Sequence, residues 1–166
     1  MSVVHSVIIL ILSAQLLFSD EHSVNSDANT DFAIFKTFAF RQVQCDSTLP
    51  DLNNSLYMKN LTEVLRTTLS AKGLKEATAN ADLLVDFRID GMELSAAGKP
   101  GRTPSEAVQG TRYAQGTLTV DLFAREKNAL VWEGIYRDRE DTASGLARGF
   151  PADARMLLAQ YPPKKK

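Results

Sequence analysis

The chain contains few of the residues that most often carry enzyme chemistry. Cys45 is its only cysteine, so neither an intrachain disulfide nor a thiolate metal cluster can form. Its two histidines, His5 and His22, lie near the N-terminus, before the region that we expect to fold. Histidine-based acid–base catalysis and histidine-ligated metal sites are therefore not expected. We predict a protein without catalytic residues, metal or cofactor.

Neither sign of charge is in excess. The 166 residues include 19 Lys and Arg and 20 Asp and Glu, which gives a formal net charge of -1. This balance gives no electrostatic case for a nucleic-acid partner, which usually requires a basic surface. The only basic run, 164–166, is typical of a solvated tail. With 44% hydrophobic and 23% charged residues, the chain fits one globular domain of ordinary composition.

Long apolar runs are also lacking. The N-terminal run Val7–Phe18 is too short for a membrane-spanning helix, which needs about 20 apolar residues. Its length suits the apolar part of a secretory signal, although no Lys or Arg precedes it and no small-residue cleavage site follows it. We expect residues 1–22 to be a signal peptide or an uncleaved anchor that would associate with a membrane, and 23–30 to be a polar linker. A buried N-terminal helix is the alternative.

The clearest structural signal is alternation between residues 113 and 136. Successive side chains of a strand point to opposite faces, so a half-buried strand shows a period of two. We expect a β-hairpin that turns at 126–128, with Trp132 packed against the apolar row of the first arm. The apolar rows are Leu118, Val120, Leu122 and Ala124 in the first arm, and Leu130, Trp132, Gly134 and Tyr136 in the second.

Two further strands are expected before this hairpin. The first is predicted at 32–40, with Ile34, Phe38 and Phe40 on its inner face, and the second, 82–90, alternates apolar with charged residues. A helix is predicted between them. Because strand–helix–strand connections are normally right-handed crossovers, the two strands should be parallel neighbours in one sheet.

Two helices are expected to cover one face of this sheet. Asn54 or Ser55 caps the first, and Gly73 ends it. The second begins at Pro151, because proline is well tolerated in the first helical turn, and Pro162 stops it. Their apolar stripes are Met58, Leu61, Val64, Leu65, Thr68 and Leu69 in the first helix and Ala154, Leu157, Leu158 and Tyr161 in the second.

Carboxylates gather on the outer face of the predicted sheet. They could bind a cation or form an acid–base pair. However, Arg88, Arg125 and Arg137 share that face, and opposite charges on neighbouring strands are ordinary on a solvated sheet. We therefore favour a salt-bridged surface over a site. The acidic residues are Asp82, Asp86, Asp90, Asp121 and Glu133.

The segment from Ser95 to Arg112 is a long loop rich in glycine and proline. Loops of this length are uncommon in compact domains and are usually functional or disordered. The loop contains no phosphate-binding motif. If the protein binds a ligand here, the candidate binding residues are Lys99, Arg102 and Arg112.

Several short motifs occur in order along residues 31–163. In this order they resemble the bacterial family known as domain of unknown function 4136, whose members are mostly cell-envelope lipoproteins. The resemblance implies an exported, envelope-associated α+β domain with no established catalytic residues. Lipoproteins carry a cysteine at the end of the signal, and Ser19–Ser23 contains none, which argues against lipid attachment but not against export to the periplasm or envelope. The motifs are Asp31-Phe32, Phe35–Phe40, Lys72–Leu74, Ala81–Val85, Gly116–Leu118, Asp121-Leu122, Leu130–Gly134 and Tyr161–Pro163.

These patterns predict a single α+β domain over 31–163, with a mixed four-stranded sheet and two helices packed on one face, followed by a basic tail at 164–166. The first functional hypothesis is a non-enzymatic module that binds a protein partner, or has a structural role, at the cell envelope. The second is a carrier of a small apolar or lipid ligand, suggested by aromatic residues on the predicted inner faces. The third, ranked last, is a carboxylate-based hydrolase that uses Asp86 and Asp121.

Overall fold

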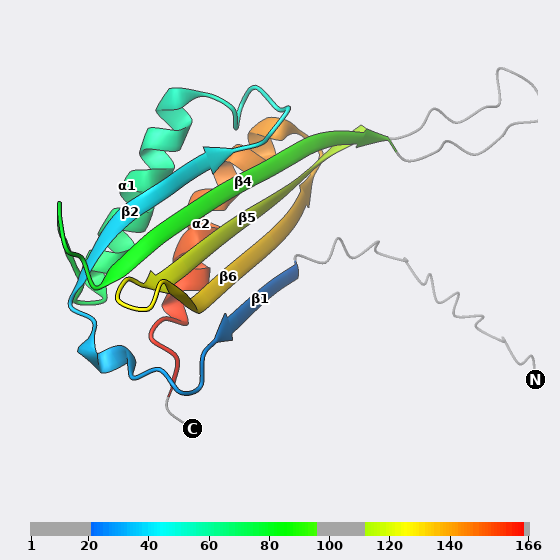
Figure 1. Cartoon of the computed structure of the whole chain (residues 1–166). Helices are drawn as coiled ribbons and strands as arrows, with labels where there is room; N and C mark the ends of the chain where they lie inside the picture. The colour runs from blue at the N-terminus through cyan, green and yellow to red at the C-terminus, as the bar shows by residue number, and fades with distance from the viewer. Residues whose placement is uncertain (1–20, 96–111, 165–166) are drawn as a thin grey trace, which may run out of the picture.

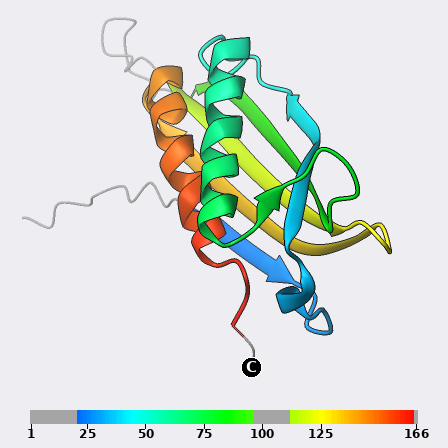
Figure 2. The ribbon, with the colours of Figure 1, turned by 90° about the vertical axis from the view of Figure 1, so that its left-hand side faces the viewer.

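The computed structural model describes residues 21–95 and 112–164, so all but the last two residues of the expected signal segment, most of the long loop and the last two lysines lie outside the described residues. The strands are β1 (Glu21–Ser26), β2 (Thr37–Cys45), β3 (Lys75–Glu76), β4 (Leu83–Ser95), β5 (Arg112–Ala124) and β6 (Ala129–Glu140), and the helices are α1 (Ser55–Ala71) and α2 (Ala143–Ala159). The described strands form one sheet in the order β1-β6-β5-β4-β2-β3 (Figure 1). Both helices pack side by side on the same face of this sheet (Figure 2).

The α+β class, the mixed sheet and the two helices are confirmed, but the predicted count of four strands is wrong, because the described residues form six. The residues expected in the signal segment and the linker contribute β1, so the expected boundary at 22/23 falls within a strand. Its sequence shows no apolar alternation, because Val24 is the one residue of β1 that is partly buried. The two-residue β3 is too short to leave a periodic signal.

The first core strand begins later than predicted. Phe32–Ile34 form a short 3-10 helix, capped by Asp31, and β2 follows it. The prediction that Ile34 faces the core is therefore wrong, since its side chain is 64% exposed. Phe38 is fully buried, as predicted. The crossover prediction is also confirmed, because β2 and β4 pair in parallel.

The hairpin of β5 and β6 follows the predicted pairing, with Leu118 opposite Tyr136 and Leu122 opposite Trp132. Beyond Leu122 the register shifts by one residue at a β-bulge. This bulge reverses the alternation, so Val131 is buried and Leu130 is 45% exposed. The prediction that Leu130 shares the inner face with Trp132 is therefore wrong.

Helix α1 matches the prediction closely. The Asn54 side chain accepts a hydrogen bond from the N–H of Tyr57 at 2.8 Å, which makes Asn54 the cap. Gly73 ends the helix with φ at +90°, a conformation that L side chains rarely adopt. The N–H of Leu74 then donates to the carbonyl of Leu69, and the Leu74 side chain is buried.

Helix α2 begins two turns before the predicted start, at Ala143, with Thr142 as its cap. Pro151 is therefore inside the helix and not in its first turn. A proline there removes a backbone hydrogen bond. Burial offsets that cost, because one apolar stripe continues through the proline from Leu146 and Phe150 to Leu157, and all three side chains are fully buried.

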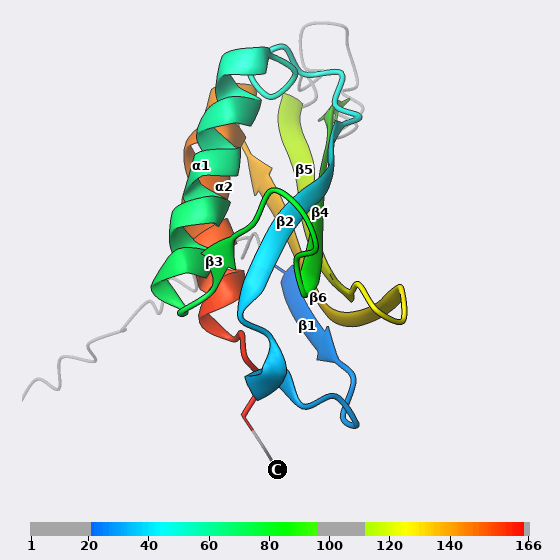
Figure 3. The same cartoon turned by 60° about the vertical axis from the view of Figure 1, so that its left-hand side comes forward.

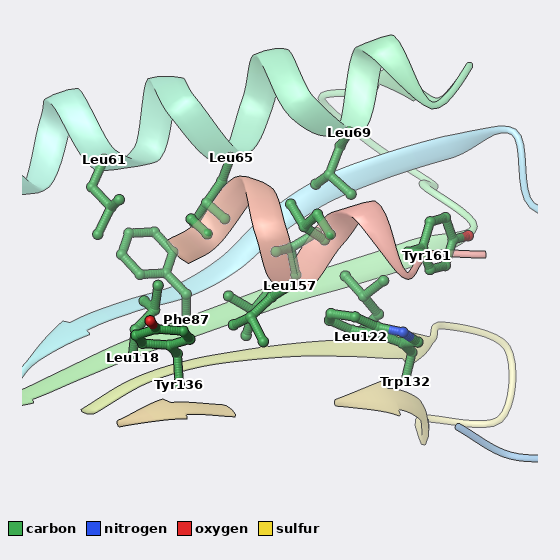
Figure 4. Packing of buried hydrophobic residues seen from close by; sticks show 14 of the residues in the cluster. Leu61, Leu65, Leu69, Phe87, Leu118, Leu122, Trp132, Tyr136, Leu157 and Tyr161 are labelled. Atoms are coloured by element: carbon green, nitrogen blue, oxygen red, sulfur yellow. The ribbon is translucent and has the colours of Figure 1, made fainter. Parts of the chain in front are cut away.

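The core lies between the helices and the inner face of the sheet (Figure 4). Trp132 is 1% exposed and packs edge-to-face on Tyr161, with ring centroids 6.1 Å apart. The Trp132 ring extends over Gly134, where a Cβ atom would lie 2.6 Å from a ring carbon and 3.3 Å from Leu157. Gly134 is therefore required by the close approach of the indole ring.

We expect Gly134→Ala to destabilise the fold by about 1–3 kcal/mol, because the added methyl group would clash with the buried Trp132 ring, which packs on Tyr161, and would crowd Leu157. Gly149→Ala is the matched control: its Cβ would make ordinary contacts, the closest at 3.4 Å, within helix α2. There alanine should be neutral or stabilising, because glycine is disfavoured inside a helix. Denaturant unfolding of both variants measures the difference, and an equal effect of the two substitutions would contradict this packing.

Candidate functional site

The face of the sheet opposite the helices carries no other layer in the described part of the chain (Figure 3). Because strand side chains alternate between faces, the residues between the core positions all point to this open face. Asp86 of β4 pairs with Asp121 of β5, which pairs with Glu133 of β6. Three carboxylates therefore lie in one row across adjacent strands, and Asn25 of β1 continues the row beside Glu133. We call these four residues the acidic row.

The two outer carboxylates of the acidic row, Asp86 and Glu133, have partners. Arg41 of β2 donates to both oxygens of Asp86, from Nε at 2.9 Å and from a terminal nitrogen at 2.5 Å. The side-chain amide of Asn25 donates to Glu133 at 3.2 Å. The Oδ1 atom of Asp121, in the middle, is buried and has no hydrogen-bond partner among the described residues. A buried acceptor without a donor carries a desolvation cost, so Asp121 is the least satisfied group of the row.

Burial, together with the negative charges of Glu133 and Asp86, raises the pKa of Asp121 from 3.8 to about 6. Arg88 and Arg41 oppose this rise but do not cancel it. Asp86 and Glu133 lie directly opposite Asp121 on the neighbouring strands, and like charges in such positions repel each other. This repulsion favours the protonated form of Asp121. The open face therefore takes up a proton at Asp121 under mildly acidic conditions.

The remaining predicted carboxylates do not join the row. Oδ2 of Asp82 accepts hydrogen bonds from the N–H groups of Lys36 and Thr37 and from the Thr37 hydroxyl, at 2.8–2.9 Å. These bonds, first that from Lys36, lower the pKa of Asp82 below 3.8 and fix the start of β2. Asp90 pairs with Arg88 at 3.2 Å on its own strand.

The partner of Asp86 was missed by the sequence analysis. Arg41 lies where the register of β2 shifts between Phe40 and Gln42, and such irregularities are not visible in periodicity. Of the predicted arginines, Arg88 lies on the open face, Arg137 pairs with Glu21 at 3.4 Å, and Arg125 lines a cavity at the end of the sheet.

Apolar side chains flank the acidic row on the open face. The guanidinium of Arg41 lies 4.2 Å from the ring centre of Phe123, which follows Asp121 on the same face. Leu130, opposite Phe123, and Met92, further along β4, are 45% and 50% exposed. The open face therefore combines exposed apolar side chains with charged ones.

Of the predicted loop residues, Lys99 and Arg102 lie outside the described residues. Arg112 is the exposed first residue of β5, opposite Ser95 and nine residues before Asp121 along the strand. The structure therefore does not bring Arg112 into the acidic row, and its binding role stays a prediction.

Two surface cavities lie at the end of the sheet, away from the acidic row. One of about 700 Å³ is lined by the loop after β1, the residues before β4 and the β5–β6 turn, and it includes charged side chains of both signs. Its neighbour, of about 660 Å³, lies between the same loop and Pro162, Pro163 and Lys164. Neither lies between the helices and the sheet, where an apolar ligand would be enclosed.

The chemistry of the described residues is limited in two further respects. No group of three His, Cys, Asp or Glu side chains within 21–95 and 112–164 is arranged to hold a metal ion. Over the same residues, neither helix has the length and hydropathy needed to cross a membrane. What the acidic row can do is accept hydrogen bonds and charge from an external donor, and exchange one proton near pH 6.

These features define a class: a one-domain α+β protein whose sheet has one face covered by two helices and the other open in the described residues. A model of the family described as "Domain of unknown function (DUF4136)" matches residues 22–163, and the chain belongs to this family. The predicted resemblance is thereby confirmed. Among curated proteins, no relative matches the chain.

Solved structures are similar to this chain at low sequence identity. A PDZ domain protein from Parabacteroides distasonis is 16% identical with a TM-score of 0.62; the match covers 87% of this chain but 36% of that one, so the present chain spans about a third of its length. A Helicobacter pylori homolog of the neuraminyllactose-binding hemagglutinin is 11% identical, with a TM-score of 0.53 and coverage of 80% and 86%. A DUF4136 family protein from Bacteroides thetaiotaomicron is 17% identical, with a TM-score of 0.47 and coverage of 85% and 92%.

We expect Asp121→Asn to stabilise the fold at pH 8 by about 1 kcal/mol, after allowance for the screening of a half-exposed group. The folded-state pKa is raised, so the contribution of Asp121 to stability is fully present below pH 3.8 and is lost as the pH rises through about 6. The advantage of the asparagine variant should therefore fade between pH 7 and pH 4.

Thermal unfolding of both proteins from pH 4 to pH 8 measures this effect. Asp90→Asn is the matched control, because Asp90 lies on the same face but outside the row and is paired with Arg88. A pH-independent effect of Asp121→Asn, or the same profile for Asp90→Asn, would show that the acidic row does not hold a proton.

Proposed function

We propose that this chain is a non-enzymatic, envelope-associated module that binds a protein partner on the open face of its sheet. The observation that carries the proposal is the segregation of the two faces: both helices cover one side, and the other exposes the acidic row beside Phe123 and Leu130, with Met92 further along β4. Exposed apolar groups next to an unsatisfied buried acceptor fit a protein interface better than an ordinary solvated face.

The charge of the row indicates what the partner presents. Oδ1 of Asp121 lacks a donor, and the carboxylates on both sides repel the charge of Asp121. A lysine or arginine side chain of the partner would donate to that oxygen and also reduce the repulsion. Such a charge-assisted hydrogen bond is stronger than a neutral one, and a guanidinium could also contact the neighbouring carboxylates.

The envelope is part of the proposal. It is supported by the apolar run Val7–Phe18, which has the length of a secretory signal, and by membership of a family that the sequence analysis links to the cell envelope. The periplasm is the compartment that we expect, without lipid attachment, because no cysteine follows the run between Ser19 and Ser23.

The two other hypotheses have less support. A carboxylate hydrolase would need a free acid and base beside a substrate cavity, but Asp86 is bound by Arg41 and neither large cavity is lined by Asp86 or Asp121. An apolar carrier would need an enclosed apolar space, but the aromatic residues that suggested it belong to the core. Four of them are buried and Phe40 is partly buried against them; the four are Phe38, Phe87, Trp132 and Tyr161.

Photo-crosslinking in living cells tests the interface. A photoreactive residue in place of Arg88, which is exposed next to the acidic row, should capture one protein partner, whereas the same residue in place of Leu56 on α1 should not. The adduct at position 88 should fall at least about tenfold with Asp121→Lys, because a cationic partner group would then be repelled. Glu63→Lys is the matched control, since it makes the same charge change on the helix side.

Capture from Leu56 but not from Arg88 would contradict the proposal. So would an adduct at position 88 that Asp121→Lys leaves unchanged. Recovery of several unrelated proteins in equal amounts from both positions would show that the open face is an ordinary solvated surface.

N-terminal sequencing of the protein recovered from the periplasmic and membrane fractions tests the compartment. We expect a new N-terminus before β1, close to residue 20, and recovery in the periplasm. An intact Met1 in the cytoplasmic fraction would exclude export. An intact Met1 in the membrane fraction would instead identify residues 1–22 as an anchor.

A further inference from the structure

The outer edge of β1 is unpaired in the described part of the chain. β1 is the first strand of the sheet and hydrogen-bonds to β6 alone. Its six residues are exposed except for Val24, which is partly buried against the core. An exposed strand edge presents a row of free N–H and C=O groups, which is a template for another strand.

One hydrogen bond fixes which backbone groups face outward. The N–H of Asp27 donates to the carbonyl of Val131 at 2.9 Å, beside the pair Ser26–Trp132. In an antiparallel ladder this makes Ser26–Trp132 a non-hydrogen-bonded pair, so the odd-numbered residues of β1 bond to β6. The N–H and C=O groups of His22, Val24 and Ser26 therefore point away from the sheet.

The opposite edge of the sheet is protected and the β1 edge is not. The strand at the opposite edge is β3, which has only two residues, Lys75 and Glu76, both charged. Next to it, the register of β2 shifts between Phe40 and Gln42, beside Arg41. Short strands, charges and bulges are the usual means of preventing edge pairing. β1 pairs with β6 in a continuous register and contains no proline, glycine, lysine or bulge.

We propose that β1 pairs with β1 of a second copy of this chain, antiparallel, about a two-fold axis at Val24. The outward groups at 22, 24 and 26 are symmetric about Val24, so His22 of each copy would face Ser26 of the other. The two-fold axis would be perpendicular to the sheet, so the helices of both copies would lie on the same side of the joined sheet. This agrees with pairing Val24 to Val24, because directly opposed residues of antiparallel strands point to the same face. The two Val24 side chains would then meet on the helix side, where Val24 already contacts the core.

The symmetry also explains why the second copy is the occupant that fits. Pairing of one unprotected edge with itself is isologous and closes at a dimer. The protected β3 edge then remains at both ends, so no fibre grows. Glu21 would lie opposite Asp27 of the second copy only at the ends of the pairing, where solvent screens the repulsion. Because the contact is confined to one short strand, the dimer should be weak.

Sedimentation equilibrium of the full purified chain, from about 10 μM to about 1 mM, tests this proposal. Val24→Pro removes an outward N–H without removing a bond to β6, and proline is tolerated at an edge. Val24→Ala loses the valine packing but keeps the N–H. We expect the dissociation constant of the proline variant to exceed that of the alanine variant at least about tenfold. Circular dichroism checks that both variants fold.

Cysteine crosslinking decides the outcome if the proline variant unfolds. In a Cys45→Ser background, Val24→Cys places the two thiols in a directly opposed pair, whose Cα separation of about 5.5 Å suits a disulfide. In Asn25→Cys the two Cα atoms would lie about 8 Å apart, which does not. Rapid disulfide dimer formation at position 24 and not at 25 supports the proposal. A monomer at all concentrations, equal dimerisation of the proline and alanine variants, or equal crosslinking at both positions overturns it.

Discussion

Burial of one face of the β4–β5–β6 ladder beneath two helices is the constraint on which the rest of this structure depends. Leu118 and Leu122 of β5 are fully buried in that layer, and Trp132 of β6 fills the space that Gly134 leaves beneath Leu157. Because a strand offers only two faces, fixing these residues inward also fixes their neighbours outward. The acidic row is thus a consequence of core packing: the same register that joins Leu122 to Trp132 places Asp121 opposite Glu133.

The open face combines stabilising contacts with one unsatisfied group. Arg41 contacts both Asp86 and Phe123, so it neutralises one end of the acidic row and covers an aromatic ring. At the other side of the row, the side-chain amide of Asn25 donates a hydrogen bond to Glu133. Asp121 between them has no donor for its buried oxygen, and neutral pH leaves it charged among like charges. An energetic cost concentrated at one half-buried position on the open face is a common property of residues that act in binding, and this supports the proposed protein interface.

Much of the covered face could be predicted from the sequence, because burial produces periodicity. The strand at 82–90, the hairpin and α1 all follow from apolar spacing, and their inward residues Phe87, Leu118 and Leu65 are buried. The elements that could not be predicted are those whose sequence has little periodicity or an interrupted one. β1 is polar because it is held by β6 alone, and the bulge beside Leu122 reverses the alternation. The early start of α2 was not predicted, because Pro151 was interpreted as the first turn of the helix although Leu146 and Phe150 before it belong to the same apolar stripe. The acidic residues of the row were predicted, but Arg41 depends on a register shift that no pattern reveals.

Acrylamide quenching of tryptophan fluorescence is the most direct test of this account, because Trp132 is the only tryptophan and is buried in the covered face. With Trp132 1% exposed beneath α2, emission should be shifted to short wavelength and should resist quenching until the protein unfolds. Emission at the wavelength of a solvated indole, with quenching equal to that of the unfolded chain, would contradict the packing from which the open face and its acidic row follow.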